Sequence, residues 1–328
     1  MKSLHKYLIL LIFFSSPLAQ AAAPPAARIG MLGMGSHPSD PNSPAWAQLL
    51  ASLRVLGWVD GKTAVLDPRG AAGSVERLQQ MAEELARSQP AVVFTSGGAE
   101  AAAMHKATAN APRKVPVVMM HSIDPVGLGY AQSLRRPGGN MTGLTLRADG
   151  MVGKQIEILR EAVPRIRRIA IILGAHQPAE VIQEVEQATR KLGLTFVKVL
   201  PGKPEEFEQM FARLARERID AYLAPLDALT FPHRARFCAA AAKARMPGIA
   251  ETAEYAEAGC FLTYGANLAA LCRRAAALGD KILRGANPAE LPIEQPTHFD
   301  LHLNGKTARA LGLTVPPTIL VRTEKIVE

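Results

Sequence analysis

The sequence predicts an α/β protein made of two similar lobes, each built on a mostly parallel sheet. Short runs rich in Val and Ile alternate with helical patterns along the chain, and this alternation is typical of βαβ units. A length of 328 residues with 48% hydrophobic content allows two domains that each bury a core. The layout also occurs twice, because three sequence pairs keep their order and nearly their spacing: 28–33 with 168–174, 91–95 with 221–225, and 116–129 with 247–259.

The N-terminus predicts export. Two lysines precede the apolar run 7–14, and small residues follow at 19–21. This is the pattern of a secretory signal peptide, and the apolar run is too short for a membrane anchor. We therefore predict that residues 1–21 are a signal peptide, cleaved after about Ala21, and that the mature protein lies in the periplasm. No cysteine lies near the cleavage position, so we expect no lipid anchor.

The charge and the aromatic content disfavour nucleic acid as a partner. The formal net charge of +9 falls to +7 without the signal peptide, which holds two lysines and no acid. The remaining Lys and Arg residues are scattered beside Glu over many predicted helices, and only 5% of residues are aromatic. Such scatter is typical of a solvated surface, and base stacking needs aromatic side chains.

The chain has three cysteines, Cys238, Cys260 and Cys272. An odd number cannot pair completely, and the spacing fits neither a CxxC motif nor a zinc site. We expect buried thiols. The alternative is a disulfide between Cys260 and Cys272, which would require that the strand near Cys260 and the helix that contains Cys272 lie in contact.

The first half of the chain is predicted to form one lobe. A strand at 28–32 leads into a glycine-rich loop that lacks the third glycine of a dinucleotide fingerprint, so we expect no nucleotide site there. Ser43 and Pro44 then begin a helix that ends at Gly57. The next expected elements are a strand at 63–67, a helix from Ser74 with Val75, Leu78, Ala82 and Leu85 on its apolar face, a strand at 91–95, a helix at 99–109, a strand from 115 to about 121, a helix at 125–135, and an extended segment from Gly143 through Leu146.

The second half is predicted to repeat the alternation. A helix at 150–163 carries apolar residues at helical spacing and ends at Pro164. The following elements are strands at 168–173, 195–200, 221–224, 248–250, 261–264 and 299–303, helices at 178–192, 204–216, 231–245, 267–284 and 304–311, and an extended tail at 312–328.

Two neighbouring loops carry polar residues at the ends of predicted strands. Thr95, Ser96 and Gly97 directly precede a helix, where free backbone N–H groups and the helix dipole favour an anion. Taken alone, these residues are better explained by a plain helix cap with glycines for a tight turn, and it is the neighbouring loop that favours a binding site. His121, Ser122 and Asp124 follow the next strand, and Asp124 before Pro125 is the pattern of a helix N-cap. Together the loops make half of a pocket at the carboxyl ends of the strands.

Three segments resemble the substrate-binding proteins of ABC transporters, in particular the TrpX-like family. They are Asp124-Pro-Val-Gly-Leu-Gly through Pro-Gly-Gly-Asn-Met-Thr-Gly143, then Gly153 to Pro164, and Asn304 to Pro317. The resemblance implies a type I periplasmic-binding-protein fold, with two Rossmann-like lobes, three crossings between them, a ligand in the cleft and closure about a hinge. It also implies delivery of the ligand to a membrane permease driven by an ATPase.

The resemblance divides the chain into discontinuous lobes. Residues 27–143 plus 265–288 are expected to form lobe 1, and residues 144–264 plus 289–328 are expected to form lobe 2. Two departures from the family lie at the expected cleft. The loop 33–44 is long and rich in Pro and Asn, and Gly248-Ile-Ala-Glu251 lacks an aromatic residue that is often found there. The family's ligand therefore cannot simply be carried over.

We expect a small polar ligand, such as an amino acid and in particular an aromatic one, held by hydrogen bonds from both lobes. For an amino acid, the N–H groups at 96–99 would bind the carboxylate, and Glu251 or Asp227 the ammonium. Tyr255 has a core position as its alternative. The expected residues are Ser36, Thr95, Ser96, Gly97, His121, Ser122 and Asp124 from lobe 1, and His176, Asp227, Glu251, Tyr255 and Tyr264 from lobe 2.

We expect no cofactor, no metal ion, no enzyme activity and a monomer. His37, His121 and His176 each follow a strand but lack the spacing of metal ligands. A two-lobed racemase would use Cys238 and Cys260 as acid and base, yet both fall in the second half of the chain. A ligand sensor for a membrane receptor uses the same fold and stays open.

Overall fold

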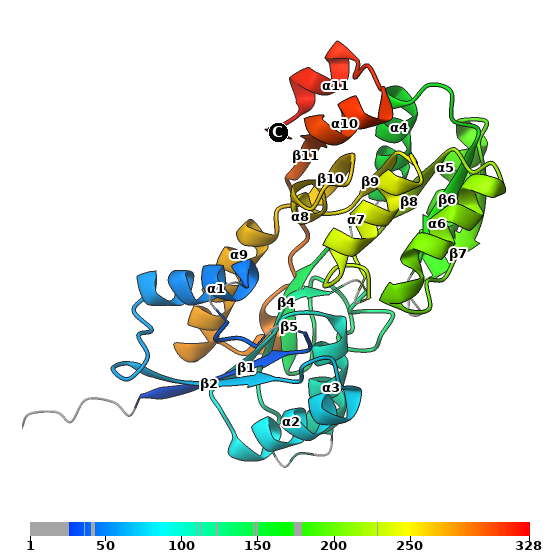
Figure 1. Ribbon diagram of the computed structural model, residues 1–328. Helices are drawn as coiled ribbons and strands as arrows, with labels where there is room; N and C mark the ends of the chain where they lie inside the picture. The colour runs from blue at the N-terminus through cyan, green and yellow to red at the C-terminus, as the bar shows by residue number, and fades with distance from the viewer. Residues whose placement is uncertain are drawn as a thin grey trace, which may run out of the picture.

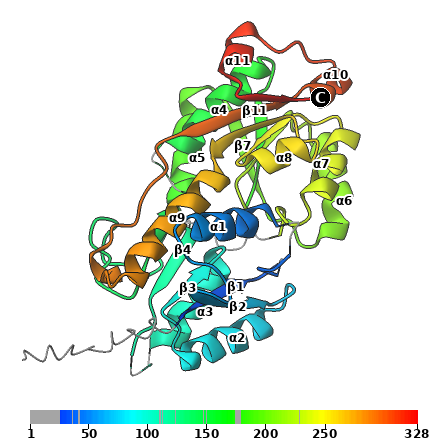
Figure 2. The same ribbon diagram turned by 90° about the vertical axis from the view of Figure 1, so that its left-hand side faces the viewer.

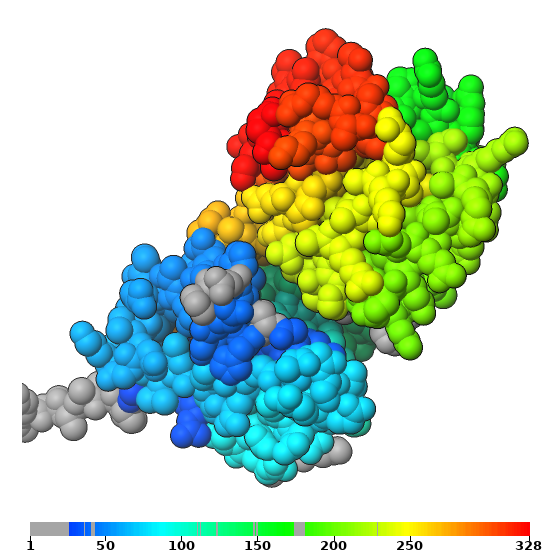
Figure 3. Space-filling model, in the orientation of Figure 1, coloured from blue at the N-terminus to red at the C-terminus, as the bar shows by residue number. Residues whose placement is uncertain are grey.

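The computed structural model describes residues 26–35, 37–40, 43–109, 111, 113–122, 124–146, 148, 150–173, 179–227 and 229–328. They form two lobes, each a sheet covered by helices (Figure 1). In the space-filling view the surface is hollowed between the blue and cyan residues of lobe 1 and the yellow and green residues of lobe 2 (Figure 3).

Lobe 1 is built on a five-stranded sheet whose paired strands are all parallel. Its strand order is β2-β1-β3-β4-β5. The strands are β1 (Ala27–Gly33), β2 (Ala64–Gly70), β3 (Val92–Thr95), β4 (Val117–Ser122) and β5 (Met141–Thr145), and the helices between them are α1 (Pro44–Val55), α2 (Val75–Ser88) and α3 (Gly98–Ala109).

Lobe 2 is built on a seven-stranded sheet in the order β12-β11-β10-β9-β8-β6-β7. The strands are β6 (Arg168–Ile172), β7 (Thr195–Val199), β8 (Ala221–Ala224), β9 (Gly248–Ala250), β10 (Leu262–Ala266), β11 (Phe299–Asn304) and β12 (Lys325–Val327). The helices are α4 (Met151–Ala162), α5 (Ala179–Lys191), α6 (Phe207–Arg216), α7 (Arg234–Lys243), α8 (Ala253–Glu257), α10 (Gly305–Leu311) and α11 (Pro317–Arg322), with a short 3-10 turn at Pro204–Glu206. A second 3-10 turn, Pro288–Glu290, contacts β5 of lobe 1.

The two sheets confirm the repeat that the sequence predicts. Lobe 1 has the order β2-β1-β3-β4-β5, and lobe 2 has the equivalent order β7-β6-β8-β9-β10. Lobe 2 then adds β11, which is antiparallel to β10, and β12, which is parallel to β11. The carboxyl ends of equivalent strands therefore lie at equivalent positions in both lobes.

Helix α9 (Leu268–Leu283) follows a strand of lobe 2 but packs on lobe 1. It contacts α1 and strands β3, β4 and β5 (Figures 1 and 2). Gly279 makes this contact possible, because a Cβ there would lie 2.2 Å from the ring of Phe94. The chain then returns to lobe 2 past residues 143–145, where the N–H of Glu294 donates to the carbonyl of Gly143. Two connections between the lobes thus run side by side.

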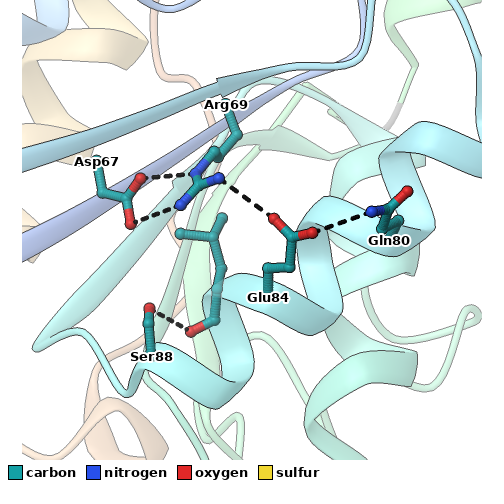
Figure 4. A network of polar contacts seen from close by, with 6 residues as sticks. Asp67, Arg69, Gln80, Glu84 and Ser88 are labelled. Atoms are coloured by element: carbon teal, nitrogen blue, oxygen red, sulfur yellow. Dashed lines mark hydrogen bonds and ion pairs between the residues drawn. The ribbon is translucent and has the colours of Figure 1, made fainter.

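Side-chain contacts fix the helices of lobe 1 on its sheet. In α1, Trp46, Leu49 and Leu53 are buried. The expectation that Val75 lies on the apolar face of α2 is wrong, because Val75 is 64% exposed. Arg69 of β2 joins Asp67 (Nε to Oδ1, 2.7 Å) and Glu84 of α2 (Nη1 to Oε2, 3.2 Å; Figure 4). These groups are partly exposed, so the pairs contribute little to stability.

The predicted helix at 125–135 does not form. The segment after β4 consists of turns, and the carboxylate of Asp124 accepts from the N–H of Gly127 at 2.9 Å. Asp124 therefore caps a turn rather than a helix. Two glycines in the first five positions explain the difference, because Gly129 adopts φ +76° and glycine costs about 1 kcal/mol in a helix interior.

The predicted extended tail is also wrong. Residues 317–322 form α11, with Pro316 as the N-cap and Pro317 at the first helical position, where a missing N–H costs nothing. Residues 325–327 form the edge strand β12. Arg322 pairs with Glu161 of α4 at 3.0 Å and thereby holds the tail against lobe 2.

The expectation of buried free thiols is wrong for Cys238 and Cys260 and is confirmed for Cys272. Cys238 of α7 forms a disulfide with Cys260, which precedes β10, and their Cα atoms are 4.8 Å apart. Cys272 is a buried free thiol. It lies on α9, which packs on the other lobe, so a bridge from Cys260 to Cys272 is not made. The order of elements in space, which local sequence patterns do not reveal, decides this pairing.

Candidate ligand-binding site

The candidate site lies where the strands of both sheets end. In lobe 1, β3 ends at Thr95 and β4 at Ser122, and in lobe 2, β8 ends at Ala224 and β9 at Ala250. Ligands of open parallel sheets bind beyond the carboxyl ends of the strands. Most predicted site residues follow these four strand ends.

A cavity of about 40 Å³ opens in lobe 2 beside the loops after β8 and β9. This is room for a group of about the size of one water molecule, so a whole amino acid would not fit inside it. Three polar side chains reach it, from Gln155, Glu184 and Glu251. The rest of its wall is mainly apolar and includes Leu146, Met151, Val152, Val181, Pro225 and Leu226.

Glu251 is the carboxylate of this cavity. Its side chain follows β9 directly and is only 6% exposed. The N–H of Leu226 donates to Oε2 at 2.6 Å, and no lysine or arginine in the described parts of the chain pairs with this carboxylate. Burial raises the pKa of Glu251 to about 7, and the hydrogen bond from Leu226 opposes this shift. A cation in the cavity would therefore stabilise the ionised form.

Gln155 is a functional candidate that the sequence analysis missed. It lies on α4, is 1% exposed, and its Nε2 donates to the carbonyl of Tyr264 at 2.7 Å. A signal for it was present, because Gln155 interrupts the apolar face that Val152 and Ile156 define. A polar side chain on an apolar helix face needs a buried partner. The bond fixes the start of α4 beside β10, next to the cavity.

Asp227 and Tyr264 lie near the lobe 2 strand ends and are half-buried. The carboxylate of Asp227 accepts from the N–H of Leu229 at 2.8 Å and from the N–H of Thr230 at 3.2 Å. It therefore stabilises its own turn. The ring of Tyr264 lies beside Phe299, with ring centres 5.9 Å apart.

Tyr255 belongs to the core, so its prediction as a ligand group is wrong. Its side chain is fully buried, and its hydroxyl lies 2.7 Å from the hydroxyl of Thr230. Its ring packs against Phe231 and Phe237, and burial raises its pKa. The helical spacing of α8 turns this side chain under the surface.

Cys238 and Cys260 offer no acid–base pair. Both sulfurs are joined in the disulfide within lobe 2, so neither can exchange a proton with a ligand. The racemase alternative is therefore wrong for these residues.

In lobe 1, Thr95 and Ser122 end their strands with fully buried side chains. Neither hydroxyl has a hydrogen-bond partner among the described residues. The carbonyl of Ser122 accepts from the N–H of Leu146, at the connection to lobe 2. These side chains therefore lie beneath the site surface. Ser36 and His176, two further predicted residues, lie outside the described residues.

The structure brings Ser96, Gly97 and His121 together around a residue that the sequence analysis missed, Glu100. The hydroxyl of Ser96 donates to Glu100 Oε1 at 2.5 Å, and the N–H of Met34 donates to the same oxygen at 2.8 Å. A Cβ on Gly97 would lie 3.2 Å from Glu100 Oε2 and 3.4 Å from Cε1 of His121. Glu100 thus joins the loops after β1 and β3.

Glu100 is buried, and His121 beside it is half-buried. Burial raises the pKa of Glu100, although the donors from Ser96 and the backbone oppose the shift. Burial lowers the pKa of His121 to about 4, so the imidazole is neutral at pH 7. The start of α3, where we expected a ligand carboxylate, therefore already holds a carboxylate of the chain itself. The usual signal for Glu100, an acid in the first turn of a helix, equally marks a simple helix terminus.

Two further properties of the described residues concern membranes and metal ions. No described helix has the length and apolar content to cross a bilayer. The residues that the structure describes also contain no group of three or more His, Cys, Asp or Glu that would hold a metal ion.

Comparisons with known proteins agree with this architecture. A family model described as ABC transporter substrate binding protein matches residues 33–327. The tyrosine-binding protein of Clostridioides difficile (strain R20291) is 22% identical over 287 residues, which are 87% of this chain and 81% of that protein.

Two solved structures share the fold. A conserved domain protein from Vibrio cholerae superposes with a TM-score of 0.83 at 23% identity and covers 92% of this chain and 99% of its own. An ABC domain in complex with L-Trp from Streptococcus pneumoniae has the same TM-score at 21% identity and covers 92% of this chain and 100% of its own.

Proposed function

Because this chain belongs to the family of ABC transporter substrate-binding proteins, we propose that it binds a small ligand with an ammonium group and an apolar body between its two lobes. An aromatic amino acid is such a ligand. The protein is exported to the periplasm, cleaved after about Ala21, and delivers its ligand to an ABC permease that a cytoplasmic ATPase drives. Two comparison proteins support this ligand class, since their names mention tyrosine and L-Trp.

The observation that carries this proposal is the buried carboxylate of Glu251. A buried carboxylate without a cation is costly, and here it lines a cavity whose wall is mainly apolar. An ammonium group of the ligand pairs with Glu251, while the body of the ligand lies against the apolar wall and the loops of lobe 1. We assign Gln155 and Glu251 to the lobe 2 half of the site, and Ser96, Gly97 and His121 to the lobe 1 half.

Calorimetric titration of the mature chain with a panel of amino acids and sugars tests this proposal. We expect saturable binding of an aromatic amino acid, and a loss of about 100-fold in affinity for Glu251→Gln, because a charge-assisted bond is lost. Glu217→Gln removes the same charge from the surface of lobe 2 and should change the affinity less than twofold. Binding of sugars alone, or equal affinity of wild type and Glu251→Gln, would contradict the proposal.

The pH dependence of the affinity gives a second test of the same pairing. The ligand cation binds the ionised form of Glu251, and the pKa of this group is about 7 in the free protein. We expect the affinity to fall by up to tenfold per pH unit below about pH 7 and to level off above it. The affinity of Glu251→Gln should not depend on pH in this range. If it still does, another group causes the pH dependence.

Delivery to a permease is tested with the membrane complex. Liganded protein should stimulate ATP hydrolysis by the reconstituted permease and ATPase, whereas binding to a receptor kinase instead would favour the sensor alternative.

A further inference from the structure

Glu100 stands out because it is a buried acidic side chain beside the lobe 1 loops of the candidate site, and no described lysine or arginine pairs with it. Its side chain is 4% exposed, although it lies on the first turn of α3 beside the loops after β1 and β3. Neighbouring His121 does not offset the charge, since its imidazole is neutral at pH 7. Buried Glu residues are rare unless they are paired or have a function.

We propose that Glu100 is a specificity-determining residue that keeps a ligand carboxylate away from the lobe 1 loop, so that the ligand presents a neutral or cationic group there. The inference rests on the proposed function and adds the charge of the ligand at its lobe 1 end. It also replaces our expectation that the backbone at 96–99 binds the carboxylate of an amino acid.

The hydrogen bonds of Glu100 explain the exclusion. Its carboxylate accepts from the N–H of Met34, the hydroxyl of Ser96 and its own backbone N–H. These donors, together with the positive end of the α3 dipole, are what would otherwise attract an external anion. A second carboxylate at this loop would find these donors already used by Glu100, and its oxygens would face those of Glu100 where little water screens their repulsion.

Gly97 leaves the Glu100 carboxyl group close to the surface of the loop after β3. Without a side chain, it leaves Glu100 Oε2 and the His121 ring next to its Cα, where a Cβ would lie within 3.4 Å of both. Residue 97 therefore has no side chain that would separate the Glu100 carboxyl group from a ligand at this loop.

A probe pair that differs only by the carboxylate tests the proposal, namely L-tryptophan and tryptamine. The variant is Glu100→Gln, whose amide oxygen still accepts from Met34 and Ser96 but carries no charge. We expect the ratio of the Kd of tryptophan to the Kd of tryptamine to fall about tenfold in this variant. The control Glu83→Gln, which removes an exposed charge on α2, should leave the ratio within twofold. An unchanged ratio in Glu100→Gln would overturn the inference.

A second measurement works without knowledge of the ligand. Acetate should raise the Tm of Glu100→Ala, because it refills the position of the lost carboxylate, and should leave wild type and Glu83→Ala unchanged. If neither indole probe binds wild type, the proposed ligand class fails, and the acetate result alone then decides the inference. An equal effect of acetate on all three proteins would overturn it.

Discussion

The two halves of the cleft each carry a buried glutamate, but the two carboxylates have different surroundings. Glu100 of lobe 1 accepts from Met34, Ser96 and its own backbone, and it holds two loops together. Glu251 of lobe 2 accepts from Leu226 and lines a cavity. The sheets behind them repeat the same strand order. The duplicated framework therefore supports a lobe 1 loop that is internally satisfied and a lobe 2 loop that has room for a cation.

The difference shows how one residue type can have two environments at equivalent places of two similar lobes. A buried carboxylate that has several protein donors is fixed and excludes other anions, whereas one with a single donor and an adjacent cavity gains most from a ligand. The unliganded protein bears the cost of burying Glu251, as its raised pKa shows. Binding residues are often destabilising in this way.

The largest expected difference between the lobes comes from the disulfide, which lies within lobe 2. The bridge from Cys238 to Cys260 spans a sequence separation of 22 residues, and in the chain-entropy model a loop of this size stabilises by about 3 kcal/mol. Cys238→Ala/Cys260→Ala should therefore lower the free energy of unfolding by roughly this amount in urea titrations. Hydrogen exchange should become faster in the strands of lobe 2 and stay unchanged in β1 and β3. Equal effects on both lobes would mean that they unfold as one unit.

Glu251→Gln should stabilise the unliganded protein at pH 8. The folded pKa of about 7 lies above the ordinary value of 4.5, so the folded state holds this proton more tightly than the unfolded state does. Proton binding by Glu251 therefore stabilises the folded state fully below about pH 4.5. This stabilisation decreases between about pH 4.5 and pH 7 and is absent above that range. Glutamine has no proton to lose, so the variant keeps this part of the free energy of unfolding, which amounts to at most about 3 kcal/mol. Urea unfolding at pH 4 and pH 8 measures it, and a gain of equal size at both pH values would contradict the cause.

Glu100→Ala should act in the opposite direction and destabilise the protein by about 2 kcal/mol. The N–H of Met34 and the hydroxyl of Ser96 lose their acceptor in a buried place, and each unmade bond is costly. Thermal unfolding of the variant beside Glu83→Ala, which should change stability by less than about 0.5 kcal/mol, measures the effect. A Glu100→Ala protein as stable as wild type would show that these bonds contribute nothing net.

The sequence predicts the framework of the fold well, because hydrophobic periodicity reflects burial directly. The strand expected at 168–173 is found at Arg168–Ile172, and the helix expected from Pro44 to Gly57 is found at Pro44–Val55. The segment after β4 was misassigned because Asp124 and Pro125 imitate a helix start while Gly127 and Gly129 favour turns. The sequence there contains both helix and turn signals, and the two glycines favour the turn conformation.

The site was harder to predict, because strand ends specify where polar residues gather but not where their side chains point. Glu251 lines the cavity, whereas Tyr255, one helical turn later, is in the core. Gln155 and Glu100 were missed since both lie on helices, and their partners, Tyr264 and Met34, come from distant parts of the chain. Such partners become visible only once the fold brings them together.

The smallest expected effect concerns two adjacent glycines in the lobe 1 loop, Gly97 and Gly98. A Cβ on Gly97 would lie 3.2 Å from Glu100 Oε2, whereas a Cβ on Gly98 would meet nothing within 4 Å. Gly97→Ala should therefore destabilise the protein by about 1 kcal/mol through crowding. Gly98→Ala should be neutral or stabilise by up to about 1 kcal/mol, since alanine restricts the unfolded chain and favours the helix.

Thermal unfolding of the two variants side by side separates crowding from the general effect of replacing a glycine. Because the crowding arises from Glu100 and His121, the double variant Gly97→Ala/Glu100→Ala should lose less stability than the sum of the two single losses, as expected for side chains in contact. Purely additive losses would place the Glu100 carboxylate farther from this loop than 3.2 Å and would weaken the contrast between the two halves of the cleft.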